Sequence, residues 1–152
     1  MLTRLVVAIL LGGVLGVERE IVGKEAGIRT EIVVAGGASI FTMIALVLPY
    51  IISAHTGNLA DVVAQNSGVI QIIANIVIGI GFLGTGLIIK TGDHPHGLTT
   101  AALVWTTAAI GILVGIGLFE FAAVAAVIIA FVLYILRKMN ISEKIEGGAN
   151  NR

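Results

Sequence analysis

Gly79, Gly81 and Gly84 follow the pattern G-x-G-x-x-G, and Gly86 comes two residues later. This spacing is typical of the turn that holds the pyrophosphate of a dinucleotide, where the glycines let the backbone approach the phosphates. Such a site also needs a strand before the glycines and an acidic residue about 20 residues further on. Here the glycines lie inside an apolar run of helix length, and the next acid, Asp93, comes too early. The sequence argues against a nucleotide site.

Two other roles remain open for this glycine block. Small residues let helix backbones approach closely in lipid, and Gly12 and Gly16 have the spacing for a close crossing, either within the chain or in a homodimer. Alternatively, each glycine weakens a helix by about 1 kcal/mol relative to alanine. A helix broken in this way usually lines a cavity or site. In both cases we expect replacement of Gly81 or Gly84 by leucine to disrupt assembly.

Charged residues crowd the segment from Glu18 to Glu31, directly after the first apolar stretch. They can form an interfacial anchor of mutual ion pairs, or a network joining the ends of the first two helices, with Glu18 and Arg29 as partners. Ionisable groups at membrane depth are functional candidates. Glu18, Arg19 and Arg29 therefore form a candidate inner-face cluster, with Thr30 beside them as the N-cap of the next helix.

A second polar segment, Lys90–Thr100, contains Asp93 and two histidines one residue apart. These side chains can bind a metal only if a third and a fourth ligand are held in the right geometry, so the pattern predicts no metal site. Asp93 and the hydroxyls of Thr99 and Thr100 are added to the inner-face candidates, the threonines as caps at a helix start.

Composition places all these residues in a membrane protein. Of the 152 residues, 57% are hydrophobic and 12% are charged, where soluble domains average roughly 25% charged. The formal net charge is zero, which favours no nucleic-acid partner. The chain has no cysteine, so disulfides and thiolate metal sites are excluded.

The apolar stretches predict an all-α, polytopic transmembrane bundle of five spans, near 1–21, 31–54, 69–89, 99–116 and 119–137. The first is short and spans only if Arg4 reaches outward to water. Every Lys and Arg except Arg4 falls on one side of this arrangement. We therefore expect the N-terminus outside and the C-terminus in the cytoplasm. Residues 1–137 form the membrane domain, and 138–152 are expected to be a disordered polar tail.

Few polar residues lie inside the predicted spans. Gln71 and Asn75 are expected to hydrogen-bond between helices, and Trp105, placed in mid-helix, to pack between them. No Asp, Glu, Lys or Arg is expected in mid-membrane, which weakens the case for a proton-coupled transporter. No catalytic motif is present, so we expect no enzyme.

Four blocks, in this order and spacing, resemble the membrane domain of the MgtC/SapB family: LLGGVLGVERE (Leu10–Glu20), GKEAGIRT (Gly23–Thr30), GIGFLGTGLI (Gly79–Ile88) and GLTTAALVWTTAAIGI (Gly97–Ile112). The resemblance covers about residues 2–136. The family's motif residues fall on Glu18, Arg19, Arg29, Thr30, Gly79, Gly81, Gly84, Gly86, Gly97, Leu98, Thr99 and Thr100, and Trp105 matches a common aromatic. Two departures stand out. Many members carry an arginine where this chain has Gln71, and well-studied members have a soluble C-terminal domain, before which this chain ends.

The resemblance implies an inner-membrane protein without enzymatic activity, linked to growth in low magnesium and, in some members, to virulence. It implies action through a membrane partner such as the membrane sector of the F-type ATP synthase. The alternative is a cation transporter or channel for Mg²⁺. We expect contact with the lipid bilayer, a homodimer as an open possibility and no cofactor, with Mg²⁺ the one candidate ligand.

Overall fold

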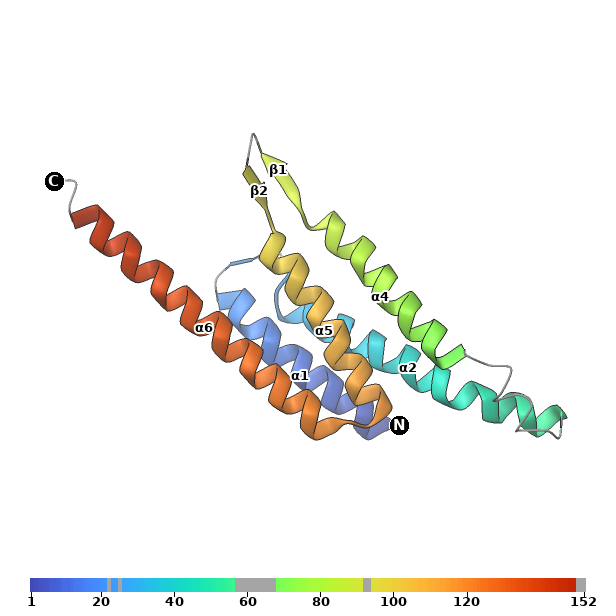
Figure 1. Ribbon diagram of the computed structural model, residues 1–152. Coiled ribbons are helices and arrows are strands. Elements are labelled where there is room, and N and C mark those ends of the chain that lie inside the picture. Colours follow the sequence, from blue (N-terminus) through green and yellow to red (C-terminus); the bar gives the residue numbers. More distant parts are fainter. Residues whose placement is uncertain (22, 25, 57–67, 92–93, 150–152) are drawn as a thin grey trace.

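The computed structural model describes residues 1–21, 23–24, 26–56, 68–91 and 94–149, and within them the chain forms a helical bundle (Figure 1). Its elements are α1 (Leu2–Ile21), α2 (Ile28–Thr56), α4 (Gly68–Gly86), β1 (Ile89–Thr91), β2 (His94–His96), α5 (Leu98–Ile116) and α6 (Phe119–Ala149). The predicted all-α class and the order of the helices are confirmed. The only strands among the described residues form one short antiparallel hairpin, in which Ile89 pairs with His96.

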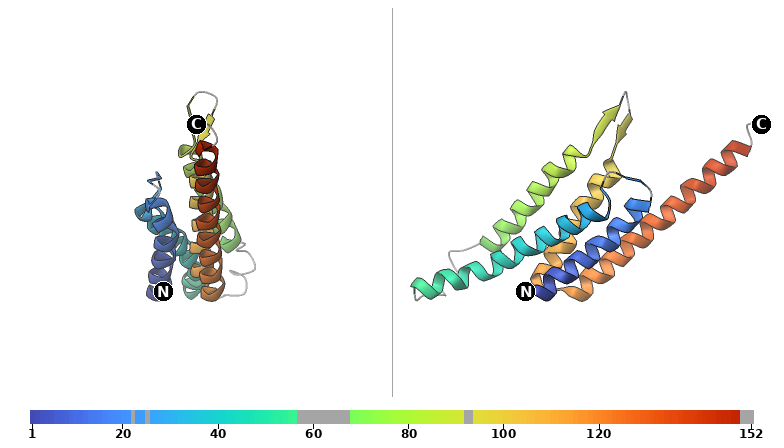
Figure 2. Two further views of the ribbon diagram at one scale, coloured as in Figure 1. Left: turned by 90° about the vertical axis from the view of Figure 1, so that its left-hand side faces the viewer. Right: turned by 180° about the vertical axis from the view of Figure 1, so that it is seen from behind.

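α2 and α5 form the centre of the bundle, and the other helices pack around them. α1 packs against α2, α5 and α6, whereas α4 contacts only α2 and α5 among the more extensive contacts. Consequently α4 and α6 lie on opposite sides of the bundle (Figures 1 and 2). The hairpin and the α1–α2 connection lie at one end, and the N-terminus lies at the other (Figure 1).

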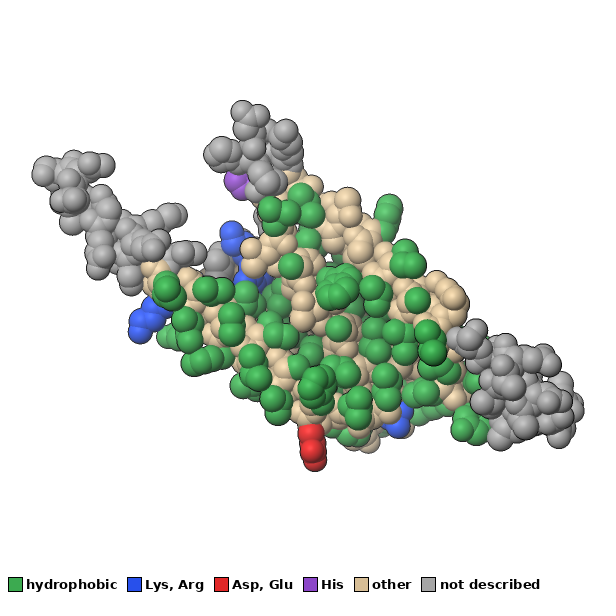
Figure 3. All heavy atoms as spheres, in the orientation of Figure 1, with side chains coloured by type: hydrophobic (Ala, Val, Ile, Leu, Met, Phe, Trp, Pro, Cys, Tyr) green, Lys and Arg blue, Asp and Glu red, His purple; other side chains and the backbone are tan. Residues whose placement is uncertain are grey.

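Four helices in the described residues are long and apolar enough to cross a membrane: Ile28–Ile51, Gly68–Gly86, Leu98–Ile116 and Phe119–Met139. Hydrophobic side chains cover the visible face of the molecule, and the charged ones lie toward its ends (Figure 3). α1 is not among the four, although its 20 residues are long enough at about 1.5 Å per residue. It carries Arg4, Glu18, Arg19 and Glu20. Five spans and their orientation stay predictions.

Two helix boundaries differ from those expected. α2 begins at Ile28, so Thr30 lies within the helix and is not its N-cap. The backbone N–H of Ile28 instead donates to the Glu20 carboxylate (3.1 Å), which caps the helix from the preceding one. At the other end of the chain, α6 continues to Ala149, into the segment for which disorder was expected. Residues 137–146 contain no glycine or proline, so nothing local stops the helix there.

The turn between α5 and α6 is as tight as the sequence predicts. Gly117 follows α5 with φ +106°, and its N–H donates to the carbonyls of Leu113 and Val114. The N–H of Leu118 donates to the Leu113 carbonyl at 2.9 Å, which completes a Schellman motif. Two residues thus suffice to reverse the chain.

Arg4 supports this turn from the first helix. Its Nη1 donates to the Gly115 carbonyl at 2.6 Å, and its guanidinium lies close to Gly117. The carbonyls in the last turn of a helix lack helical partners and carry partial negative charge, so a cation there is stabilising. The sequence predicts that Arg4 reaches outward to water. In the structure its side chain instead binds the end of α5.

Close packing of glycines joins three of the helices. A Cβ on Gly12 would lie 2.6 Å from the Glu31 carbonyl oxygen, and one on Gly16 would lie 2.5 Å from Ile28 Cα. From α5, a Cβ on Gly111 would collide with the Ala35 carbonyl oxygen of α2, and one on Gly115 would lie 2.7 Å from Thr42 Cβ. The pair Gly12 and Gly16 therefore serves packing within the chain.

We expect Gly111→Ala to lower the unfolding temperature of the protein in detergent, because the methyl group must displace the α2 backbone. Overpacking of this kind typically costs about 1–3 kcal/mol. The control is Gly81→Ala, because a Cβ on Gly81 meets nothing within 4 Å. It should leave stability unchanged or raise it by up to about 1 kcal/mol through helix propensity. Equal effects of both variants would contradict the close contact.

Arg4→Met keeps much of the length of the side chain but removes its charge and its donors. We expect it to destabilise the protein by about 1.5–3 kcal/mol, the range for hydrogen bonds of charged groups. Thermal unfolding in detergent would measure this, with Lys24→Met as the control, since Lys24 is exposed. If Arg4→Met unfolded at the wild-type temperature, the proposed support of the α5 end would be wrong.

Candidate functional site

The most unusual side chain in the structure is that of Glu31, one turn into α2. It is fully buried, with 0% of its surface exposed. Neither of its carboxylate oxygens has a hydrogen-bond partner among the described residues. Buried carboxylates are rare unless they are paired, because taking charge out of water is expensive. Glu31 is thus the first candidate for a functional group.

Two neighbouring helices bring polar groups to Glu31. Thr107, buried in α5, has its hydroxyl in a position to interact with the carboxylate, and Arg19 of α1 acts on it electrostatically. The Thr107 hydroxyl also lacks a hydrogen bond of good geometry. We call Arg19, Glu31 and Thr107, with Glu18, the three-helix junction.

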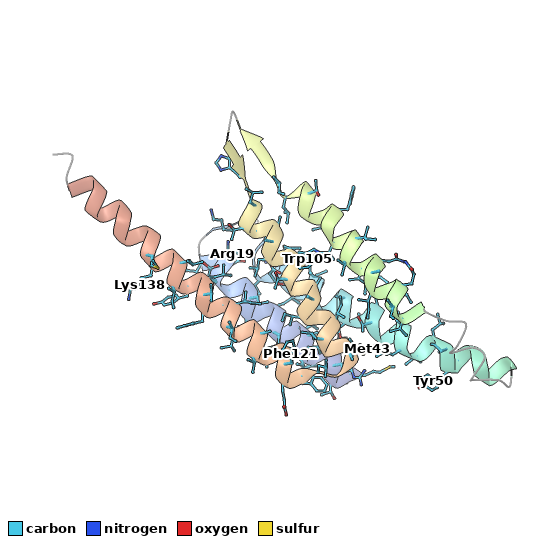
Figure 4. All side chains as sticks on the ribbon, viewed as in Figure 1. Arg19, Met43, Tyr50, Trp105, Phe121 and Lys138 are labelled. Atoms are coloured by element: carbon cyan, nitrogen blue, oxygen red, sulfur yellow. The ribbon has the colours of Figure 1, made fainter. Side chains whose placement is uncertain are left out.

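Arg19 has a closer acidic partner than Glu31. Its Nε lies 2.7 Å from the Glu18 carboxylate, and both side chains are largely buried, with 7% and 12% of their surfaces exposed. Arg19 sits in the last turn of α1, at the end of the bundle where the hairpin lies (Figure 4). A cation is favourable at this helix end. The junction therefore holds two acids and one base in a mostly buried space.

Only part of the predicted inner-face cluster meets at the junction. Glu18 and Arg19 pair with each other. Arg29 is exposed and does not pair with Glu18, so the predicted pair of Glu18 and Arg29 is not formed. Thr30 is half-buried within α2. At the start of α5, Thr99 is exposed, whereas Thr100 is buried at 2% exposure.

The start of α5 is set by the backbone conformation of Gly97, and not by a capping hydroxyl of Thr99 or Thr100. Gly97 is its N-cap, with φ +84° and no side-chain cap. A Cβ there would collide with the Leu87 carbonyl oxygen, so only glycine fits between the hairpin and α5. Asp93 lies outside the described residues. Among those that are described, no three His, Asp or Glu side chains form a group able to hold a metal.

The glycine block does not break its helix. α4 runs without interruption from Gly68 to Gly86, so the block acts as part of a continuous surface. Only Gly84 faces another helix, with its Cβ position 3.6 Å from the Ala101 carbonyl oxygen of α5. Positions 79, 81 and 86 meet nothing within 4 Å. At position 81 the structure thus shows no close contact within the chain, and the expected effect of leucine on assembly stays a prediction.

The predicted intramembrane polar residues, Gln71, Asn75 and Trp105, are exposed. Gln71 donates from Nε2 to the Asn75 side-chain oxygen at 3.1 Å within α4, so this bond does not join two helices. Trp105 of α5 was expected to pack between helices, but its side chain is exposed (Figure 4). In lipid these side chains are available to neighbouring molecules.

A groove of about 460 Å³ separates α4 from α2. Val33, Gly37 and Phe41 line it from α2, and Asn75 and Gly79 are among the residues that line it from α4. Its walls are almost entirely apolar. It leaves one long side of α4 without close packing against the rest of the bundle.

Sequence reasoning missed Glu31 and Thr107 as site residues because it assigned Glu31 to a polar loop. One signal was available: at helical spacing, Glu31 shares a face with Ala35, Ala38, Ser39 and Thr42, which are all small or polar. Such a face indicates close helix contact in a membrane. The spacing of Gly111 and Gly115 then places Thr107 one turn further along the matching face of α5.

Comparison with known proteins gives a consistent picture. Residues 5–141 match the model of the MgtC family. The chain is 41% identical to "Protein MgtC" of Brucella abortus (strain 2308) over 132 residues, which cover 87% of this chain and 49% of the relative. It is 40% identical to "Protein MgtC" of Salmonella typhimurium (strain LT2) over 134 residues, covering 88% and 51%.

The chain thus spans about half the length of these curated relatives. No solved structure matches it. The family match covers the described helices α1, α2, α4 and α5 almost completely, and α6 up to residue 141. With this extent of matching sequence and its membrane-spanning helices, the chain belongs to the MgtC family.

Proposed function

We propose that this chain is a non-enzymatic inner-membrane protein that binds a membrane partner through α4, in adaptation to low magnesium. One observation carries the proposal. The glycines of α1 and α5 are occupied by α2, whereas Gly79, Gly81 and Gly86 of α4 have open space at their Cβ positions. Backbones exposed in this way let a second helix approach closely, which is how helices associate in lipid.

The membrane sector of the ATP synthase is our candidate partner, as the family resemblance implies. Three features of α4 support binding to an apolar helix. Its sequence is uncharged, most of its surface is open to lipid, and Gln71 and Asn75 supply exposed amides. Amide side chains hydrogen-bond across helices in membranes, with about 0.6–2 kcal/mol for each bond.

The test is recovery of the partner from native membranes in mild detergent. We expect subunits of the ATP synthase membrane sector to co-elute with the wild-type chain. Gly81→Leu should reduce their recovery about tenfold, equivalent to about 1.4 kcal/mol. The matched control is Val127→Phe, which enlarges an exposed residue of α6.

Three outcomes would contradict the proposal: no co-eluting protein, equal recovery with Gly81→Leu, or equal loss with Val127→Phe. A second, differently tagged copy of the chain as the sole partner would establish a homodimer instead. A Cβ at position 81 meets nothing within 4 Å. The unfolding temperature of Gly81→Leu in detergent then separates loss of the partner from misfolding.

Transport of Mg²⁺ is the alternative, and the buried acids Glu18 and Glu31 are the observation that favours it. Mg²⁺ requires near-octahedral oxygen ligands and keeps several waters. Arg19 lies beside both acids and opposes a divalent cation there. We therefore expect no Mg²⁺ flux above that of empty vesicles when the protein is reconstituted in proteoliposomes. A flux that Glu31→Gln abolishes would establish the transporter instead.

A further inference from the structure

The environment of Glu31 constrains its charge. The side chain lies where α1, α2 and α5 meet. The backbone of Gly12 in α1 packs against the backbone carbonyl of Glu31. It is fully buried and both carboxylate oxygens lack hydrogen bonds among the described residues. An ionised carboxylate without partners in such a place is destabilised by several kcal/mol, and the usual response is to bind a proton.

The cation at the junction does not remove this constraint. Arg19 is the one basic side chain among the described residues that acts on Glu31, and its Nε is paired with Glu18 at 2.7 Å. One guanidinium thus faces two acids. With both acids ionised, the junction would carry a net negative charge inside the bundle.

No other charged group of the described residues is placed to compensate. α4 and α5, which both pack on α2, contain no titratable residue. Glu20, near the end of α1, accepts from the Ile28 N–H. Lys24 in the α1–α2 connection and Arg29 in α2 are exposed. Among the described residues, the charge that acts on Glu31 is therefore that of Arg19, which is paired with Glu18.

Thr107 suits a neutral carboxyl group. Its hydroxyl is fully buried and lacks a partner of good geometry, as do the oxygens of Glu31. A protonated carboxyl can donate to a hydroxyl and accept from it, so one proton allows both buried groups to be satisfied.

We propose that Glu31 is a proton-binding site: its carboxyl carries a proton while α1, α2 and α5 are packed as described, and on release it competes with Glu18 for Arg19. On release, the O–H bond of Glu31 breaks, the proton passes to water, and the carboxylate keeps the electron pair. Arg19 then shares its charge between two acids on different helices. Proton binding thereby links the pH of the water at the loop end of the bundle to the contact between α1 and α2.

Infrared spectroscopy of the full chain in lipid nanodiscs tests this, since a protonated carboxyl has a carbonyl stretch distinct from that of a carboxylate. We expect the band of a protonated carboxyl group at neutral pH. The band should be lost in Glu31→Gln. It should persist in the matched control Glu120→Gln, which removes an exposed carboxylate.

A second variant separates proton binding from a merely structural role. Glu18→Gln frees Arg19 to pair with Glu31, so the acid band should disappear at a pH lower than in the wild type. We expect the midpoint to fall by about one pH unit or more, a tenfold change in proton affinity. This test holds even if Glu31→Gln does not fold.

The proposal is overturned if the wild type shows no acid band that depends on Glu31 from about pH 5 to about pH 9. This interval lies above the ordinary pKa of an exposed glutamate, about 4.3. It is also overturned if Glu18→Gln leaves the midpoint unchanged or raises it. Because these measurements use the purified chain without a partner, they are independent of the function proposed for α4.

Discussion

The structure depends on the short distance at which three helix backbones meet. α2 lies between α1 and α5, and each neighbour presents two glycines, four residues apart, to the α2 backbone. Lipid supplies no hydrophobic force between helices, so van der Waals contact at this distance must hold them together. The contact surface on α2 is accordingly small or polar, with Ala35, Ala38, Ser39 and Thr42 along it. The same closeness leaves the Glu31 side chain fully buried.

The three-helix junction and the exposed surface of α4 both follow from where the glycines lie. Where glycines meet a neighbouring helix, they exclude solvent and leave polar groups such as Glu31 and Thr107 deeply buried. Where they meet nothing, as on α4, they leave backbone exposed to lipid. The two regions share α2 and α5 as their support, so the central helices hold both a dry polar site and an open apolar surface.

Much of the fold could be predicted from the sequence, because apolar length determines helix length in a membrane. The expected start of α6 and end of α5 agree with the structure, since Gly117 stops one helix in a position that favours glycine. The start of α2 could not be predicted, because its cap comes from Glu20 on another helix. The number of spans is not decided by composition alone, since α1 is long enough but carries charges at both ends.

The site was harder to predict than the fold. Glu18 and Arg19 were identified because they follow an apolar segment, but their pairing with each other was not. Glu31 was missed because the sequence predicted that α2 begins at residue 31, which grouped Glu31 with the charges of the preceding loop. In the structure α2 begins at Ile28, so Glu31 lies within the helix. For the glycine block, spacing alone cannot distinguish occupied from open positions. Gly12 and Gly81 both belong to glycine-rich patterns in apolar helices. They differ in that a neighbouring helix contacts Gly12 and none contacts Gly81.

The bond between Arg4 and the Gly115 carbonyl has a consequence for biogenesis. The two residues are 111 positions apart, so Arg4 has no such partner until the ribosome has made α5. α1 also has the charged residues Glu18, Arg19 and Glu20 at its other end and is less apolar than the four helices that follow. During synthesis, Arg4 is thus made long before the carbonyl group to which it donates.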